Sequence, residues 1–140
     1  MTGLWPDDDE LRRILRETHT IAVLGASNKP TRPSYGVYRY LLAIGDYQVY
    51  PVNPMISEID GAKVYPSLAQ LPVVPDMVDV FRRLEEVPAV LAETLALQPR
   101  PKSLWLQLGL WDEQVARDAT AAGLQIVMDR CLKVDHARLF

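Results

Sequence analysis

The sequence predicts an α/β protein: a single Rossmann-like, three-layer domain with a five-stranded parallel sheet and helices on both faces. Short, almost entirely apolar segments alternate with longer segments whose apolar residues recur at helical spacing. Strands buried on both faces of a parallel sheet have this continuous apolar character. Alternating strands and helices favour parallel strands joined by right-handed crossovers. We expect the strand order 3-2-1-4-5, with its switch point between the first and fourth strands.

The expected elements follow one another through one domain that spans residues 1–140. An amphipathic helix is predicted at about 6–17, where acidic residues come first, basic residues last, and the apolar residues form one stripe. Residues 55–75 are expected to be irregular, with turns at Gly61 and at Tyr65-Pro66 and a short helix from Ser67 to Leu71. The predicted strands are 21–24, 47–52, 77–81, 104–108 and 125–128. Two further helices are predicted to begin at caps, one at Ser34 and one at Asp112. Two others are predicted to span 85–98 and 133–140.

The composition excludes several classes of function. The net charge is −3 and the pI is about 5.3, whereas a general nucleic-acid binder is usually basic. A single cysteine excludes an intrachain disulfide, and two distant histidines form no metal cluster. No apolar run approaches the ~18 residues of a membrane span. Because no signal peptide is recognisable, we expect a cytoplasmic protein without a nucleic-acid or membrane partner.

The segment between the first strand and the next helix carries the strongest functional signal. It lies at the carboxyl end of a strand and beside a helix N-terminus, where free N–H groups and the helix dipole favour an anion. The segment contains two cations and no acid, and its donors are Ser27, Asn28, Lys29, Thr31, Arg32 and Ser34. This composition indicates a phosphate site. The alternative is an ordinary strand-to-helix connection with solvated charges.

The same segment departs from the dinucleotide-binding fingerprint. GxGxxG would place glycines at 25, 27 and 30, where the chain has Gly25, Ser27 and Pro30. The second strand ends at Asn53, whereas a unit that binds NAD has an acid there for the ribose diol. A neutral residue together with nearby cations favours a nucleotide that carries an extra ribose phosphate. The Asn53-Pro54 pair also suits a simple turn.

Later strand ends supply further candidates. Asp79 lies inside an apolar strand, so we expect it to have a hydrogen-bond partner. Arg82 and Arg83 follow that strand, where one of them could meet a phosphate. Gly109 permits close approach after the fourth strand, and Cys131 after the fifth could be a reactive or an inert thiol.

Five segments in order resemble the small stand-alone CoA-binding domain proteins of bacteria: LGASNKPTRPSYGVYRYL, PVNP, DMVDVFRR, LWLQLG and VMDRC. That family is similar to the N-terminal nucleotide domain of the succinyl-CoA synthetase alpha subunit. The resemblance runs from about Leu11 to Cys131 and implies coenzyme A, free or acylated, as the ligand. Leu132 stands where the synthetase has a proline, so the turn there can differ in shape.

The resemblance also implies a site that draws on all five segments. Gly25, Ala26, Ser27, Lys29, Pro30 and Arg32 would contact the CoA diphosphate, with Tyr35 and Gly36 closing the loop. Val52, Asn53 and Pro54 would lie against the adenosine half, with Phe81 and Arg82 flanking the nucleotide. Gln107, Leu108 and Gly109 would border the pantetheine arm. The last segment would add Asp129, Arg130 and Cys131.

Catalysis by the chain alone is not expected from this resemblance. The synthetase uses a phosphorylated histidine from a second domain, and neither His19 nor His136 matches it. The expected function is therefore binding of CoA or acyl-CoA. Two alternatives stay open: an NADP-dependent oxidoreductase fragment, and one half of a two-component acyl-CoA ligase that needs an ATP-grasp partner. We also hypothesise that Cys131 could form a mixed disulfide with CoA.

Overall fold

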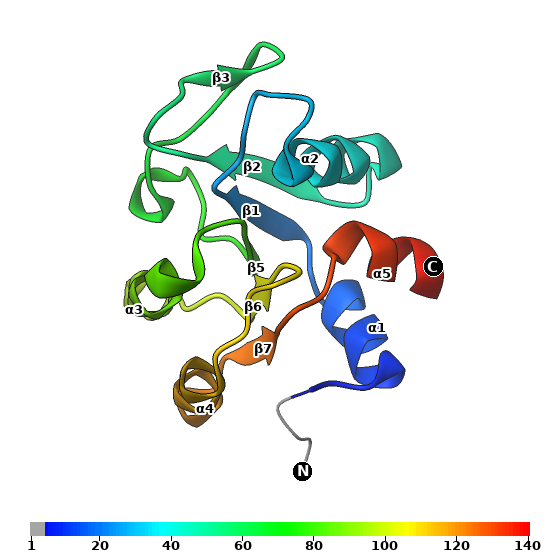
Figure 1. Cartoon of the computed structure of the whole chain (residues 1–140), viewed down its shortest axis with the longest axis vertical. Helices are drawn as coiled ribbons and strands as arrows, with labels where there is room; N and C mark the ends of the chain where they lie inside the picture. The colour runs from blue at the N-terminus through cyan, green and yellow to red at the C-terminus, as the bar shows by residue number, and fades with distance from the viewer. Residues whose placement is uncertain (1–4) are drawn as a thin grey trace.

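Parallel strands form the middle layer of the fold in a computed structural model that describes residues 5–140 (Figure 1). They are β1 (Thr20–Leu24), β2 (Gln48–Val52), β5 (Met77–Val80), β6 (Ser103–Leu106) and β7 (Gln125–Val127). Their spatial order is β2-β1-β5-β6-β7, and every neighbouring pair is parallel. The predicted Rossmann-like class with five parallel strands is confirmed.

The predicted strand order 3-2-1-4-5 is wrong, because β5, the third strand of the sheet along the chain, pairs with β1. The observed order is 2-1-3-4-5, which makes β2 an edge strand. Gln48 N–H donates to the His19 carbonyl, and the Val52 carbonyl accepts from Gly25 N–H, so both groups face β1. Pro51 therefore directs its nitrogen to the outer edge, where no donor is needed. The switch point moves to the boundary between β1 and β5.

Helices cover both faces of this sheet (Figure 1). One face carries α1 (Asp8–Arg16), α2 (Pro33–Ile44) and α5 (Leu132–Leu139), and the other carries α3 (Val87–Ala96) and α4 (Glu113–Ala121). The predicted caps have different outcomes. Asp112 caps α4 by accepting from Val115 N–H, but Ser34 does not cap α2, because α2 begins at Pro33 with Arg32 at the N-cap.

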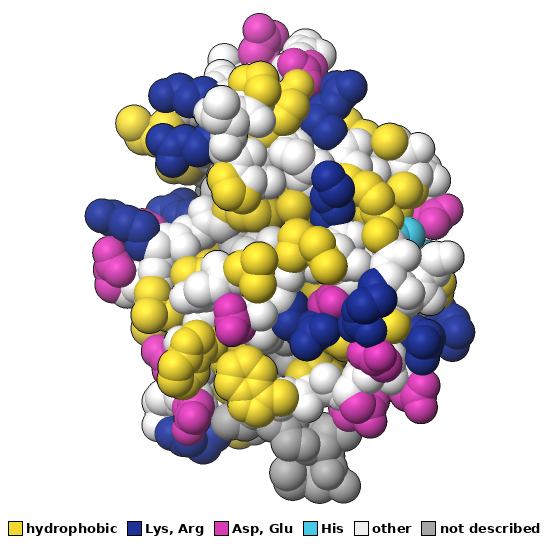
Figure 2. All heavy atoms as spheres, turned by 45° about the vertical axis from the view of Figure 1, so that its right-hand side comes forward, with side chains coloured by type: hydrophobic (Ala, Val, Ile, Leu, Met, Phe, Trp, Pro, Cys, Tyr) yellow, Lys and Arg dark blue, Asp and Glu magenta, His cyan; other side chains and the backbone are white. Residues whose placement is uncertain are grey.

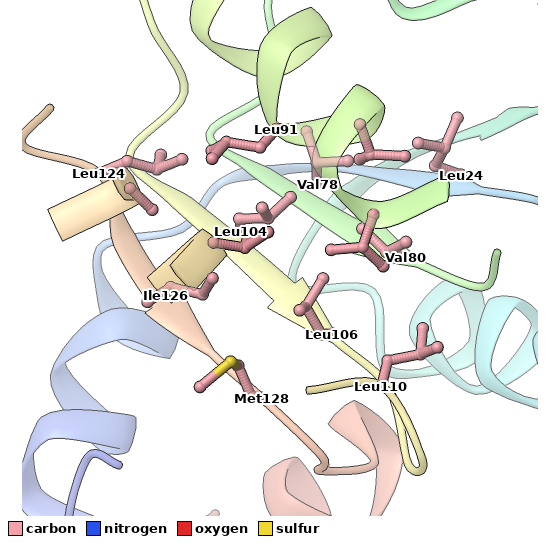
Figure 3. Packing of buried hydrophobic residues seen from close by; sticks show 14 of the residues in the cluster. Leu24, Val78, Val80, Leu91, Leu104, Leu106, Leu110, Leu124, Ile126 and Met128 are labelled. Carbon is pink, nitrogen blue, oxygen red and sulfur yellow. The ribbon is translucent and has the colours of Figure 1, made fainter. Parts of the chain in front are cut away.

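Alternation along the strands divides the core between the two faces. Figure 3 shows the first core, in which Val78, Leu104 and Ile126 project from adjacent strands toward the α3 and α4 side. Their neighbours Met77 and Trp105 belong to the second core, under α1, α2 and α5. Each strand thus has an apolar side chain for both faces, as a sheet with two covered faces requires.

Asp79 is the exception in this pattern. It lies on β5 between Val23 of β1 and Trp105 of β6, and its side chain is fully buried. Neither carboxyl oxygen has a hydrogen-bond partner among residues 5–140, so the predicted partner is not found. Loss of solvation raises the pKa of Asp79 well above the ordinary aspartate value.

The segment between β2 and β5 is more regular than predicted. Within the range 55–75 it forms a hairpin of β3 (Glu58–Ile59) and β4 (Ala62–Lys63), followed by the short helix η1 (Leu68–Gln70). The hairpin projects beyond the sheet at the top of Figure 1. Asp60 in its turn accepts hydrogen bonds from Tyr35 (2.8 Å) and Arg39 (3.1 Å) of α2. These contacts hold the hairpin turn against α2.

Candidate functional site

Three adjoining hollows open where the parallel strands end, and Phe81, directly after β5, lines all of them. The polar hollow, about 430 Å³, lies between the loop that follows β1 and residues 53–56. The apolar hollow, about 540 Å³, lies between α2, the loop after β6, and the start of α5. The rim hollow, about 400 Å³, extends from Asn53 to Arg83 and Glu86. The shared Phe81 side chain makes them one extended depression.

Backbone geometry fixes the start of the loop at the polar hollow. Gly25 has a φ of +90°, and a Cβ there would lie 2.1 Å from the Phe81 carbonyl oxygen. The N–H groups of Gly25 and Ala26 both donate to the Val52 carbonyl, at 2.9 and 3.2 Å. Asn53 Nδ2 then donates to the Ala26 carbonyl at 2.8 Å. Glycine is therefore required for the close passage of the loop over β5.

Two free cations follow on this loop. Ser27 Oγ accepts from Lys29 N–H (3.1 Å), and Arg32 N–H donates to the Lys29 carbonyl (3.0 Å), so the loop is folded upon itself. The side chains of Lys29 and Arg32 line the polar hollow and form no ion pair with any residue of the described range 5–140. Together with the N-terminus of α2, they provide a local positive field that suits a phosphate group.

Arg82 differs from these cations because its charge is compensated. Its guanidinium donates twice to Glu86, from Nε at 3.2 Å and from Nη2 at 2.9 Å. This pairing lowers the pKa of Glu86 to about 2 and raises the pKa of Arg82. Glu86 lies in the short helix η2 (Leu84–Glu86), which follows β5 directly. Arg82 thus forms a fixed wall between the apolar and rim hollows.

The apolar hollow is walled by Pro33, Gly36 and Val37 on one side and by Leu108 and Leu110 on the other. Polar groups enter it from Arg82, Gln107, Cys131 and Lys133. Gln107 is 6% exposed, and its Oε1 accepts from Leu132 N–H at 3.2 Å. Cys131 is a free, partly buried cysteine at the N-cap of α5.

Several residues near the strand ends stabilise loops and lie outside the hollows. Asp129 adopts a positive φ of 56° and accepts from Gly109 N–H at 2.7 Å, which joins the loop after β6 to the end of β7. Arg130 donates twice to the buried Asp135, which raises the pKa of Arg130. Arg138 donates to both Asp135 and Asp8 and so connects α5 with α1.

The structure divides the predicted site residues into two groups. The residues that line at least one hollow are Gly25, Ser27, Lys29, Arg32, Gly36, Asn53, Pro54, Phe81, Arg82, Gln107, Leu108 and Cys131. The predicted residues that line none of the three hollows are Ala26, Pro30, Tyr35, Val52, Gly109 and Arg130. Ala26 and Val52 are buried in the core, and Tyr35 contacts the β3–β4 turn.

Other residues line the hollows without having been predicted from the sequence: Pro33, Val37, Met55, Ile56, Glu86, Leu110 and Lys133. Met55 and Ile56 belong to the segment that was predicted to be irregular, where no periodic pattern marks a wall. The position of Lys133 could have indicated a site residue, because it lies in the first turn of a predicted helix, two residues after Cys131. Within residues 5–140, no three His, Cys, Asp or Glu side chains are placed to hold a metal ion. No helix in that range is long and apolar enough to cross a bilayer.

Known proteins resemble this chain over nearly its whole length. The protein named "Uncharacterized protein YneT" of Bacillus subtilis (strain 168) is 37% identical over 132 residues, which cover 94% of this chain and 96% of that protein. The structure of cell-free ID.343 from Thermus thermophilus has a TM-score of 0.87 and 42% identity, and covers 96% of this chain and 100% of its own.

A shorter match relates the chain to an enzyme subunit. It is 42% identical over 52 residues to the alpha subunit of acetate–CoA ligase [ADP-forming] II of Pyrococcus furiosus. That match covers 37% of this chain and 11% of the ligase subunit. The sequence model of the CoA binding domain matches residues 19–137, from before β1 to within α5. The chain therefore belongs to the CoA-binding domain family.

Proposed function

We propose that this chain binds coenzyme A or an acyl-CoA at the carboxyl edge of its sheet and carries out no complete reaction alone. The observation that carries the proposal is the pair of free cations, Lys29 and Arg32, at a polar hollow that adjoins an apolar hollow through Phe81. Coenzyme A has a matching polarity, because its charged half, the 3′-phosphoadenosine and the diphosphate, continues into a long, weakly polar pantetheine arm.

Each hollow accepts one part of this ligand in the proposal. The diphosphate contacts Ser27, Lys29 and Arg32 in the polar hollow. The adenosine half lies in the rim hollow, against Asn53 and Pro54 with Arg82 alongside, and the pantetheine arm follows the apolar hollow. The predicted residues that line none of the hollows act indirectly by shaping the loops.

The contacts of Asn53 favour this ligand over NAD. Asn53 Nδ2 donates to the Ala26 carbonyl, and its Oδ1 accepts from Met55 N–H at 2.8 Å. Both ends of the amide are therefore used to brace the loop, and the ribose diol of NAD would lack its usual acidic partner.

The charge distribution supports a small anionic ligand rather than nucleic acid. Figure 2 shows Lys and Arg side chains dispersed over the face in view, with hydrophobic and acidic side chains between them. The net charge of −3 would oppose general binding to a phosphate backbone. We also propose a cytoplasmic location, where the free thiol of Cys131 would stay reduced.

Thermal unfolding with CoA, 3′-dephospho-CoA, NADP and NAD at equal concentrations tests the proposal. A ligand at 100 times its Kd stabilises the folded state by about 2.7 kcal/mol, which is a shift of several degrees for a domain of this size. We expect a shift with CoA that Lys29→Ala and Arg32→Ala each reduce. Arg117→Ala on α4 is the control, because that exposed arginine lines none of the hollows. A shift with NADP and none with CoA would overturn the proposal.

A second candidate is one half of a two-component acyl-CoA ligase. The match to the acetate–CoA ligase subunit favours it, although the matched segment covers 11% of that subunit. In this function the chain would hold CoA while a separate ATP-grasp protein activates the acid. Recovery of an ATP-grasp protein with this chain, together with ATP-dependent acyl-CoA formation by the pair, would support it. Absence of both would leave the binding function alone.

A further inference from the structure

Gln107 brings a hydrogen-bond donor without a protein partner to the lining of the apolar hollow. The residue is 94% buried, being 6% exposed, and it lines that hollow. Its Oε1 accepts from Leu132 N–H at 3.2 Å, so the orientation of the amide is fixed by a backbone donor. The Nε2 group has no hydrogen-bond partner among the described residues and is not one of their fully buried unpaired polar atoms, so it stays accessible to solvent and to a ligand. A ligand acceptor that replaces water there would meet a donor whose orientation is already fixed.

The other polar groups of the apolar hollow are also donors. Arg82 and Lys133 carry cationic side chains, and the Cys131 thiol is a weak donor. Cys131 makes no side-chain cap bond at the start of α5, so the first-turn N–H groups of Lys133 and Val134 stay open. The carboxylate of Glu86, which faces Arg82, lines the rim hollow and is not among the residues that line the apolar one.

A site that offers donors at its polar end suits a group that only accepts hydrogen bonds. A thioester carbonyl is such a group. The amides of pantetheine are not, because each brings an N–H that would need an acceptor of its own. The free thiol of CoA is a weak donor and would leave Gln107 Nε2 unpaired.

We propose that the ligand of this site is an acyl-CoA, and that Gln107 Nε2 donates to the oxygen of its thioester carbonyl. The acyl chain then lies on the walls formed by Val37, Leu108 and Leu110. Gln107 is a specificity residue in this arrangement, and no bond of the ligand is made or broken. The inference rests on the proposed binding of CoA compounds to the same depression.

Three ligands separate carbonyl recognition from apolar contact: CoA, butyryl-CoA, and S-butyl-CoA, a thioether with the same chain length but no carbonyl. Calorimetric titration of the wild-type protein should give butyryl-CoA a Kd about five- to tenfold lower than that of S-butyl-CoA, the worth of one hydrogen bond. Equal affinities for the two would overturn the inference while leaving CoA binding intact. No binding of any of the three would instead overturn the proposed function.

Gln107→Glu provides the matched variant. At pH 8 its carboxylate still accepts from Leu132 N–H but offers no donor to the ligand. We expect the ratio of the Kd values for S-butyl-CoA and butyryl-CoA to fall to about one, whatever the change in the absolute affinities. A retained preference would mean that another group reads the carbonyl. Because the wild-type comparison needs no substitution, the test stands even if the variant folds poorly.

Discussion

Replacement of Asp79 by asparagine should stabilise the protein at neutral pH. Asp79 lies in the centre of the sheet, fully buried, and has no hydrogen-bond partner among the described residues. Burial raises its pKa well above the ordinary value, so the folded protein keeps the carboxyl protonated where the unfolded chain ionises it. Asparagine has nearly the same shape and no proton to lose, so Asp79→Asn isolates the ionisation.

The pH dependence has a defined sign. Unfolded Asp79 titrates near 3.9, and below that pH both states of the protein carry the proton. Above it the folded state binds more protons than the unfolded state, so the free energy of unfolding falls as the pH rises. The loss is about 1.4 kcal/mol per pH unit for as long as the buried carboxyl stays protonated. Asp79→Asn lacks this loss.

Urea unfolding of both proteins at half-unit steps from pH 3.5 to 7 measures the effect. We expect equal stability near pH 3.5 and a growing advantage for Asp79→Asn above pH 4.5, each 1 kcal/mol appearing as roughly 3–4 °C in Tm. An advantage that does not change with pH would refute the reasoning, because it would mean that Asp79 has the same pKa in the folded and the unfolded protein. Other titrating groups are common to both proteins and cancel in the difference.

Further substitutions test the loops around the site. Gly25→Ala should lower the free energy of unfolding, measured with urea, by about 2–4 kcal/mol, because φ is +90° and the new Cβ would meet the Phe81 carbonyl oxygen. Gly36→Ala is the control and should not destabilise the protein, because the space around its Cβ is open. Asp129→Ala should speed amide exchange at Gly109 and weaken CoA binding several-fold by loss of one charge-assisted hydrogen bond, whereas Asp129→Asn should keep most of both. Incubation with CoA disulfide should add one CoA to Cys131, with release of one CoA thiol and reversal by reductant; an unchanged intact mass would mean that the thiol is inert.

The strand order shows where sequence reasoning was incomplete. The apolar runs and helical spacings predicted the fold class and most element positions, because burial on both faces leaves a strong pattern. The order of strands depends on pairing, which leaves little trace in one sequence. Pro51 was a usable signal: a strand that contains proline suits an edge, and the predicted order had placed that strand between two others. The β3–β4 hairpin escaped because strands of two residues have no detectable period.

The same limit applies to the site residues. Charge and donors in the loop after β1 predicted a phosphate site at Lys29 and Arg32, and both residues line the polar hollow; a loop with two cations, many donors and no acid beside a helix N-terminus can be recognised without coordinates. The partners of arginines could not be recognised in this way. Arg82 and Arg130 both follow a predicted strand in the sequence. Arg82 pairs with Glu86 and lines two hollows, whereas Arg130 pairs with Asp135 and lines none of the three.

Some residues of the motifs that resemble the family also support the shape of the loops. In PVNP, Asn53 braces the loop after β1 with one end of its amide and its own turn with the other. In VMDRC, Asp129 holds Gly109 and Arg130 holds α5. Loops that must present backbone N–H groups to a phosphate need such braces, because an unbraced loop would lose conformational entropy on binding. A conservative substitution such as Asn53→Asp would keep the acceptor for Met55 but lose the donor to Ala26, so it should weaken binding of CoA and its dephospho form alike.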